Sequence, residues 1–162
     1  MPSKSPPQFV NFRYDSRQPV LTVMRSIAVE RDGWINFAPS LELDELPETP
    51  SALSRVFGPK GPAIPFGTWV PGRASKRGGD SATSLGLQHG GGRHAIWRLR
   101  DAGVLVPSDW KVLGDNPRRG LVLSLPAGAD PELALDWLLR AAVELTAIAL
   151  EMTGDWRAAV HR

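Results

Sequence analysis

Glycine and proline are unusually frequent in this chain. Sixteen glycines and fifteen prolines make 31 of its 162 residues, whereas globular proteins contain about 12% of these two types together. Because both residues interrupt helices and strands, the sequence requires many turns and disfavours long uninterrupted elements. The chain length suits about one domain with its own core.

No cysteine is present, which excludes disulfides, thiolate metal sites and thiol nucleophiles. Hydrophobic residues make 42% of the chain and charged residues 22%, values typical of a globular protein. The sequence contains no uncharged apolar stretch of about 18 residues and no leader-like N-terminus. These features predict a cytoplasmic protein without a membrane partner.

Residues 1–8 contain three prolines among serine and lysine and are predicted to be a tail. Residues 9–155 are predicted to form a single α+β domain, and residues 156–162 a C-terminal tail that includes an unconstrained His161. In this fold class, an antiparallel sheet of hairpins packs against a long C-terminal helix and one or two shorter helices.

A β-hairpin is predicted near the N-terminus. Residues 20–30 are rich in β-branched side chains, Arg31-Asp32-Gly33 offers a turn, and residues 34–37 alternate large apolar side chains with others. Further predicted elements are a helix between Thr49 and Gly58, strands over 64–70 and 83–88 joined by a loop over 71–82, a helix over 92–102, and a second hairpin from 110–113 and 121–125. The acidic residues Glu42, Asp44, Glu45 and Glu48 lack the pattern of a calcium loop and predict a solvated loop.

A long helix is the most clearly marked element. Asp130 is a good N-cap, Pro131 suits the first helical position and Gly154 suits the end. Apart from a narrow polar stripe the side chains between them are apolar, so most sides of the helix need to be covered. The chain's own sheet can cover it, or a second copy can, which predicts a homodimer through residues 131–152.

The stretch His89-Gly90-Gly91-Gly92-Arg93-His94 lies between a predicted strand and a predicted helix. Glycines allow close backbone approach and N–H groups at a helix start attract anions, so this turn is a candidate site for a phosphate or carboxylate on a small molecule. Its spacing matches neither a Walker loop nor a dinucleotide fingerprint. A glycine-rich turn between a strand and a helix also needs no ligand to be explained.

No catalytic, metal or cofactor site is predicted. His89 and His94 lack an obvious third ligand. The His-Gly-Gly-Gly stretch is similar to the oxyanion segment of some esterases, but the chain contains no Gly-x-Ser-x-Gly elbow. The sequence therefore leaves the question of enzymatic activity open and favours a negative answer.

Trp97 is placed among charged residues when residues 93–102 are projected on a helix, together with Arg93 and Arg100. If its ring is exposed, it can stack on a base, an aromatic ligand or a partner's side chain between guanidinium groups. If another segment or subunit covers it, Trp97 is an ordinary buried tryptophan, which is the commoner state.

Positive charge is concentrated in the middle of the chain. Residues 67–100 contain six basic residues and one acidic residue, although the formal net charge of the chain is only +2. The candidate basic surface consists of Arg73, Lys76, Arg77, Arg118 and Arg119. With residues 93–100 it forms a candidate nucleic-acid surface, which the low net charge and the absence of a predicted helix-turn-helix disfavour.

Several segments between Leu87 and Arg140 carry a family resemblance. They are Gln88-His89-Gly90, Leu99–Val104, Asn116–Val122 and Leu135–Arg140. In these segments the chain resembles uncharacterised actinobacterial proteins of similar size. That family has no attached activity, so the resemblance transfers no catalytic residue and implies only that the Arg118–Arg119 pair and the tryptophan-bearing helix belong to a shared scaffold.

Because no catalytic set is recognisable, the leading prediction is a non-catalytic binding or interaction module, in the form of a homodimer. An alternative is a small-molecule anion site, binding or enzymatic, at Gly90, Gly91, Gly92, Arg93 and His94, with Trp97 and Arg100 nearby. A further alternative is nucleic-acid binding through the basic 73–100 segment.

Overall fold

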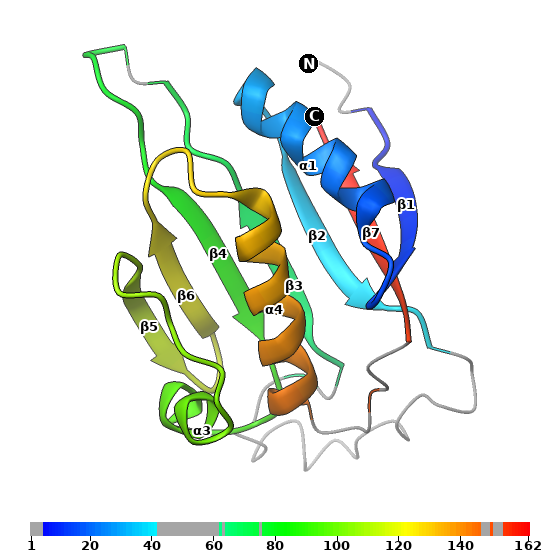
Figure 1. The fold of residues 1–162 in the computed structure, drawn as a ribbon, viewed down its shortest axis with the longest axis vertical. Helices are drawn as coiled ribbons and strands as arrows, with labels where there is room; N and C mark the ends of the chain where they lie inside the picture. The colour runs from blue at the N-terminus through cyan, green and yellow to red at the C-terminus, as the bar shows by residue number, and fades with distance from the viewer. Residues whose placement is uncertain (1–4, 42–61, 63, 75, 147–149, 151–153) are drawn as a thin grey trace.

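The structure is a computed structural model that describes residues 5–41, 62, 64–74, 76–146, 150 and 154–162. Within these residues seven strands form one antiparallel sheet in the order β1-β7-β2-β3-β4-β6-β5 (Figure 1). The strands are β1 (Gln8–Arg13), β2 (Trp34–Pro39), β3 (Phe66–Val70), β4 (Thr83–Gln88), β5 (Lys111–Asn116), β6 (Gly120–Leu125) and β7 (Asp155–His161).

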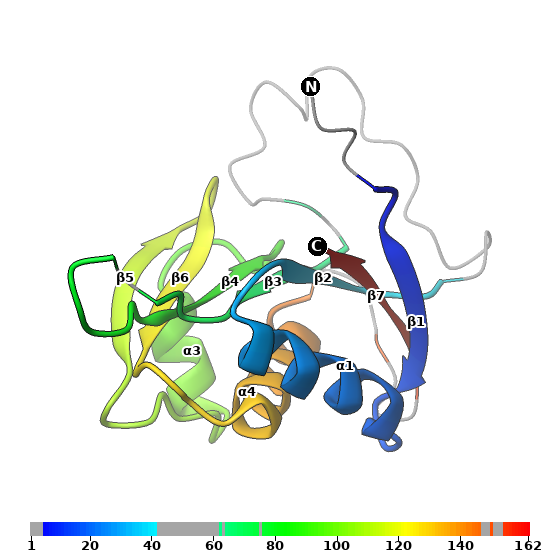
Figure 2. The same ribbon diagram turned by 90° about the horizontal axis from the view of Figure 1, so that it is seen from above.

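Three helices of the described chain cover one face of this sheet, as Figure 2 shows. They are α1 (Gln18–Glu30), α3 (Ala95–Asp101) and α4 (Pro131–Leu145). The predicted α+β class and the antiparallel sheet with helices on one face are therefore confirmed. The position of the long helix differs from the prediction, because a strand follows it.

The core lies between the sheet and the helices. Each strand alternates, so every second side chain points to the helix layer. On β6 these are Leu121, Leu123 and Leu125, and their neighbours Leu85 and Leu87 on β4 are equally buried. Strands β1, β2, β3 and β7 contribute Phe12, Ile35, Phe37, Trp69, Trp156, Ala158 and Val160 to the same layer.

The predicted hairpin over residues 20–37 is half wrong. Residues 20–30 belong to α1, whose buried side chains Val20, Leu21, Met24 and Ile27 follow a helical period. A proline occupies the first turn, and Arg31 ends the helix in the left-handed conformation (φ 56°) with its N–H donated to the Ile27 carbonyl. Helical spacing of the large apolar residues outweighs the strand preference of β-branched side chains.

Residues 34–37 do form a strand, β2, as predicted, but its neighbours are distant in sequence. β2 pairs with β3 on one side and with β7 on the other. Strands over 66–70 and 83–88, a helix before Gly103 and a hairpin of β5 and β6 are also confirmed. The predicted helix between Thr49 and Gly58 and the acidic loop over 42–48 lie outside the described residues.

The long helix begins as predicted and ends early. Asp130 caps α4 by accepting a hydrogen bond from the Glu132 N–H at 3.0 Å, but the helix ends at Leu145, because Thr146 is extended (φ −69°, ψ 145°). The predicted C-terminal tail is wrong as well. Residues 155–161 form β7, which lies inside the sheet between β1 and β2.

His161 is held on β7 rather than unconstrained. Its ring stacks on Trp34 with the centroids 4.7 Å apart, and its Nε2 lies 3.3 Å from the Asn36 side-chain nitrogen. Thr68 donates a hydrogen bond to the Asn36 side-chain oxygen at 2.9 Å. These contacts join β7, β2 and β3 on the face of the sheet opposite the helices.

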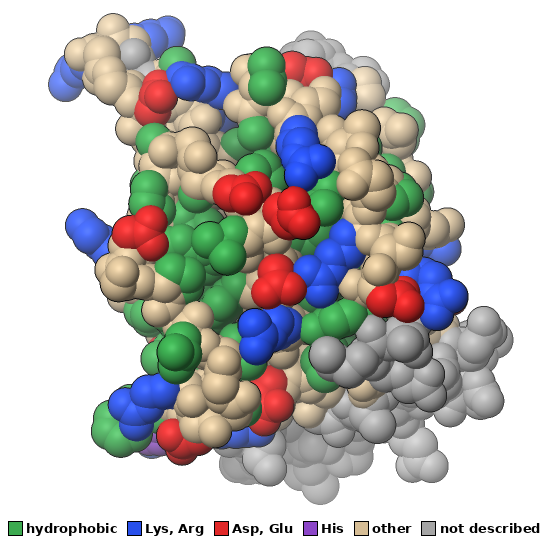
Figure 3. All heavy atoms as spheres, in the orientation of Figure 1, with side chains coloured by type: hydrophobic (Ala, Val, Ile, Leu, Met, Phe, Trp, Pro, Cys, Tyr) green, Lys and Arg blue, Asp and Glu red, His purple; other side chains and the backbone are tan. Residues whose placement is uncertain are grey.

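The apolar surface of α4 is used within the chain. Its buried residues are Ala134, Leu135, Trp137, Leu138, Leu139, Ala141, Ala142 and Leu145, and among its large apolar side chains Leu133 is exposed. Ion pairs from Asp136 to Arg17 and from Glu132 to Arg25 join α4 to α1, and Figure 3 shows acidic and basic side chains side by side over these helices. Within α4, residues 131–145, most of the apolar surface on which the homodimer prediction rested is therefore covered by the chain's own sheet and helices.

None of the described helices is long and apolar enough to cross a membrane.

Candidate functional site

The glycine-rich turn after β4 is built around a buried histidine. His89 has no exposed surface, and its Nδ1 accepts a hydrogen bond from the Gly91 N–H at 3.1 Å. Arg98, on α3, donates a hydrogen bond to the Gly91 carbonyl. A Cβ atom at Gly91 would lie 2.8 Å from the Arg98 guanidinium and 3.0 Å from the Leu145 carbonyl oxygen, so close packing explains the small residue there without a ligand.

The pKa of His89 is lowered from its ordinary value of 6.5. Burial is the main cause because it penalises the charged imidazolium, and the positive charge of Arg98 acts in the same direction, whereas Asp115 opposes it. Since Nδ1 accepts a hydrogen bond, the neutral ring carries its proton on Nε2, and that nitrogen has no partner among the described residues. His89 is thus a neutral structural residue at neutral pH.

An internal carboxylate occupies the start of α3. Asp115, on β5, accepts hydrogen bonds from the backbone N–H groups of Ala95 and Ile96, at 3.4 and 3.2 Å. Asp115 therefore caps the helix. The side chain of His94, which occupies the N-cap position, forms no capping hydrogen bond. The predicted anion site at Gly90–His94 therefore lacks the N–H groups of Gly91, Ala95 and Ile96 as free donors.

Metal binding finds no support in the described part of the chain. It holds no group of three or more histidine, cysteine, aspartate or glutamate side chains arranged to bind a metal. The two histidines of the turn differ in environment, because His89 is buried and His94 is exposed.

Trp97 is displayed on the surface. Its side chain is 64% exposed, and the guanidinium carbon of Arg100 lies 5.2 Å from the centroid of its ring. The sequence alone favoured a covering segment or subunit, but the ring is exposed with respect to the described residues of the 71–82 loop and of the N-terminal segment. An arginine stacked on an exposed tryptophan keeps the ring in place and leaves its other face free for a partner.

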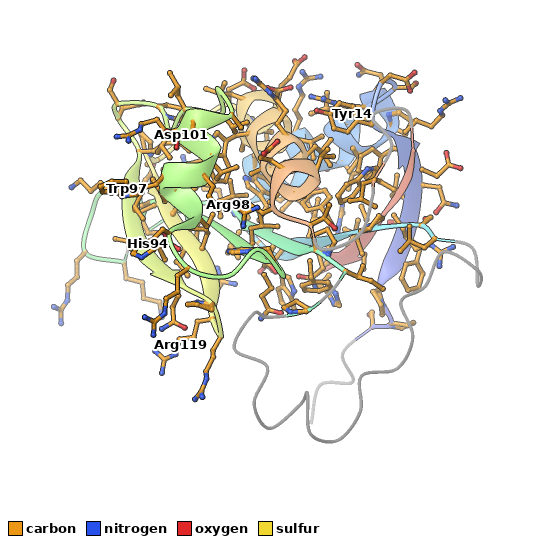
Figure 4. All side chains as sticks on the ribbon, turned by 90° about the horizontal axis from the view of Figure 1, so that it is seen from below. Tyr14, His94, Trp97, Arg98, Asp101 and Arg119 are labelled. Atoms are coloured by element: carbon orange, nitrogen blue, oxygen red, sulfur yellow. The ribbon has the colours of Figure 1, made fainter. Side chains whose placement is uncertain are left out.

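The end of β5, just before the tip of the β5–β6 hairpin, lies at the start of this helix. Asn116 fixes the tip, because its side-chain oxygen accepts hydrogen bonds from the N–H groups of Arg118 and Arg119. The neighbouring Asp115 binds the start of α3, as described above. Figure 4 shows His94, Trp97 and Arg119 on one side of the molecule, whereas Arg98 points away from Trp97.

We call this surface the α3 corner and define it by six exposed residues: Arg93, His94, Trp97, Arg100, Arg118 and Arg119. Arg93, Arg118 and Arg119 form no ion pair with a described residue, and Arg100 is 3.8 Å from the carboxylate of exposed Asp101. The corner therefore combines an open aromatic ring with cations that remain available to a partner.

The predicted basic surface is divided between the two ends of the sheet. Arg73, Lys76 and Arg77 lie on the loop between β3 and β4, where β4 begins, and the α3 corner follows the end of β4 (Figure 1). A six-residue strand separates these ends by about 20 Å. The structure places the end of β5, which leads into residues 118–119, at the start of α3, and it leaves residues 73–77 at the other end of β4.

Sequence reasoning missed Asp115, because a carboxylate that caps a helix from a separate strand leaves no local motif. It also missed the polar side chains of β7, for which the alternation of residues 155–161 was an available signal.

Comparison with known proteins gives no relative. No family model matches the chain, and no curated protein and no solved structure matches it.

Proposed function

We propose that this protein is a non-catalytic binding module that holds an acidic partner at the α3 corner. The observation that carries the proposal is the exposure of Trp97, at 64%, beside the stacked guanidinium of Arg100. A tryptophan is costly to leave in water, since its ring is one of the largest apolar side chains. Tryptophan and arginine are also the residues that most often carry binding energy in interfaces.

Charge indicates the chemistry of the partner. The corner presents Arg93, Arg118 and Arg119 without an ion pair inside the described chain. A partner segment with carboxylates can pair with these groups while an aromatic or apolar side chain packs on Trp97. An acidic protein segment fits better than nucleic acid, because the chain carries a net charge of only +2 and the second basic cluster lies at the far end of the sheet.

The test uses two labelled probes, a glutamate-rich peptide containing one tyrosine and a single-stranded oligonucleotide, in fluorescence anisotropy at low salt. The peptide is expected to bind, and Trp97→Ala or the double variant Arg118→Ser/Arg119→Ser is expected to weaken it by about tenfold or more. The matched control removes the same charge at the other end of the sheet, as Arg73→Ser/Lys76→Ser, and should leave the affinity unchanged.

If the control and corner variants lose the same peptide affinity, the loss follows the net charge of the chain and the α3 corner is rejected as the binding site. If the oligonucleotide binds more tightly than the peptide, the partner is a nucleic acid and the proposal of an acidic protein segment is wrong. If neither probe binds at low salt, the proposal fails. The homodimer prediction is tested separately by light scattering, where a mass of one chain at micromolar concentration contradicts it.

A further inference from the structure

The face of the sheet opposite the helices carries two adjoining hollows. They lie where β1, β7 and β2 meet, at the other edge of the sheet from the α3 corner. Their volumes are about 370 and 310 Å³, each within the range of small-molecule sites. Ser40 and Arg157 line both hollows, so Arg157 stands at the junction between them.

Arg157 is held in position by β1. Its Nε donates a hydrogen bond to the Asn11 side-chain oxygen at 3.2 Å, and its guanidinium carbon lies 5.7 Å from the centroid of the Phe9 ring. The two terminal nitrogens of the guanidinium form no ion pair with a described carboxylate. This arrangement leaves a planar pair of donors free for a ligand carboxylate, which arginine binds through two parallel hydrogen bonds.

A carboxylate of the protein lies beside this cation. Asp155 is two residues before Arg157 on β7, so both side chains leave the same face of the strand about 7 Å apart. Asp155 and Arg157 both line the first hollow. Arg13 lines it too, faces Asp155 across the strand pair and forms an ion pair with Asp15 at 3.4 Å. The first hollow therefore presents the guanidinium of Arg157 and the carboxylate of Asp155 on one face of β7, and neither group forms an ion pair with a side chain of the described residues.

The second hollow is mainly apolar. Apart from the shared Ser40 and Arg157, the described residues that line it are Ala38, Pro39, Leu41 and Ile64. A ligand with its charged groups at Arg157 and Asp155 can therefore extend a short apolar arm into the neighbouring hollow, where burial of its methyl groups adds affinity.

We propose that this face binds a free α-amino acid with an apolar side chain. Arg157 holds the carboxylate, Asp155 holds the ammonium group, and the hollow lined by Ala38 and Ile64 takes the side chain. This site is separate from the α3 corner and does not depend on the function proposed there.

The test is isothermal titration calorimetry with three related probes: L-leucine, 4-methylpentanoate, which lacks the ammonium group, and 3-methylbutylamine, which lacks the carboxylate. Leucine is expected to bind about tenfold or more tightly than either fragment, because each fragment leaves one charge of the site unpaired. If no saturable leucine binding is detected at concentrations up to about 10 mM, the proposal is overturned.

Variants assign the contacts. Arg157→Gln should weaken leucine by about tenfold or more, and Asp155→Asn should weaken leucine while leaving the affinity for 4-methylpentanoate unchanged. The matched control is Arg73→Ser/Lys76→Ser, on the loop between β3 and β4 and outside both proposed sites, which should leave leucine binding intact. Both tested residues are exposed, so the near-ultraviolet circular dichroism of the variants should match that of the parent. Unchanged leucine affinity in Arg157→Gln, or equal binding of all three probes, would reject the site.

Discussion

Among single residues, His89 is notable because its ionisable ring is buried. Burial lowers its pKa below the ordinary value of 6.5, so the folded chain binds fewer protons than the unfolded chain in the interval between the two pKa values. The free energy of unfolding therefore rises with pH in that interval and falls as the pH drops below about 6.5. Protonation also puts a hydrogen on Nδ1, which ends the hydrogen bond from Gly91.

We expect urea unfolding to show this loss. The free energy of unfolding should fall between about pH 7.5 and pH 5.5, and His89→Gln should lose less over the same interval, because glutamine does not titrate. An identical slope in His89→Gln and the parent would contradict the assignment to His89.

Trp97 shows how far residue-level reasoning can go before a structure is known. Helical projection placed its ring on a charged face, and the structure confirms that position on α3. Projection could not decide whether another part of the molecule covers that face, because coverage depends on where distant segments pack. The capping role of Asp115 could not be predicted for the same reason, because 20 residues separate Asp115 from the N–H group of Ala95 that it caps.

At the scale of elements, α3 is short and depends on its cap. A helix of seven residues gains little from its own hydrogen bonds, because nucleation is costly. Asp115→Ala removes the acceptor of two N–H groups and is expected to cost about 1 kcal/mol of unfolding free energy. Hydrogen exchange should accelerate at the amides of Ala95 and Ile96, which report directly on the two lost bonds.

Asp101→Ala serves as the matched control on the same helix. Asp101 lies at the C-terminal end of α3, where a negative charge is unfavourable to the helix dipole. Its removal should therefore leave stability unchanged or raise it slightly. A loss of about 1 kcal/mol in Asp101→Ala, equal to that of Asp115→Ala, would contradict the capping role.

Elements with strong local signals were predictable from the sequence. The start of α4 follows from Asp130 and Pro131, and the β5–β6 hairpin follows from alternation around a turn. The prediction failed at residues 20–30, where β-branched content suggested a strand although Val20, Met24 and Ile27 keep a helical spacing. It failed again at the end of α4, where the apolar pattern continues past Leu145 but the chain must leave the helix to supply β7.

At the scale of the whole molecule, β7 holds the sheet together. It is the single neighbour of β1 in the described sheet, and it also pairs with β2. Its side chains Trp156, Ala158 and Val160 are buried in the core. Strand order of this kind could not be predicted, because antiparallel neighbours far apart in sequence carry no local signal of their pairing.

Removal of residues 155–162 is expected to abolish cooperative unfolding. β1 would lose its partner and the core would lose three buried side chains, each contributing about 1 to 4 kcal/mol, which together approach the total stability of a typical domain. Near-ultraviolet circular dichroism and urea titration provide the measurement. Removal of Arg162 alone, an exposed residue paired with Glu30, is the control and should change little. A cooperative transition with an unchanged midpoint in the longer truncation would refute this role of β7.

The position of β7 also matters while the chain is being made. Synthesis proceeds from the N-terminus, so β1 and β2 leave the ribosome long before residues 155–161 are added. During that interval the sheet is in two parts, and the gap reserved for β7 exposes unpaired N–H and C=O groups on both sides. Such edges attract strands of other chains. A nascent chain that stalls before β7 is made would therefore expose unpaired edges on β1 and β2. We expect the rate of translation to influence how much of this protein aggregates.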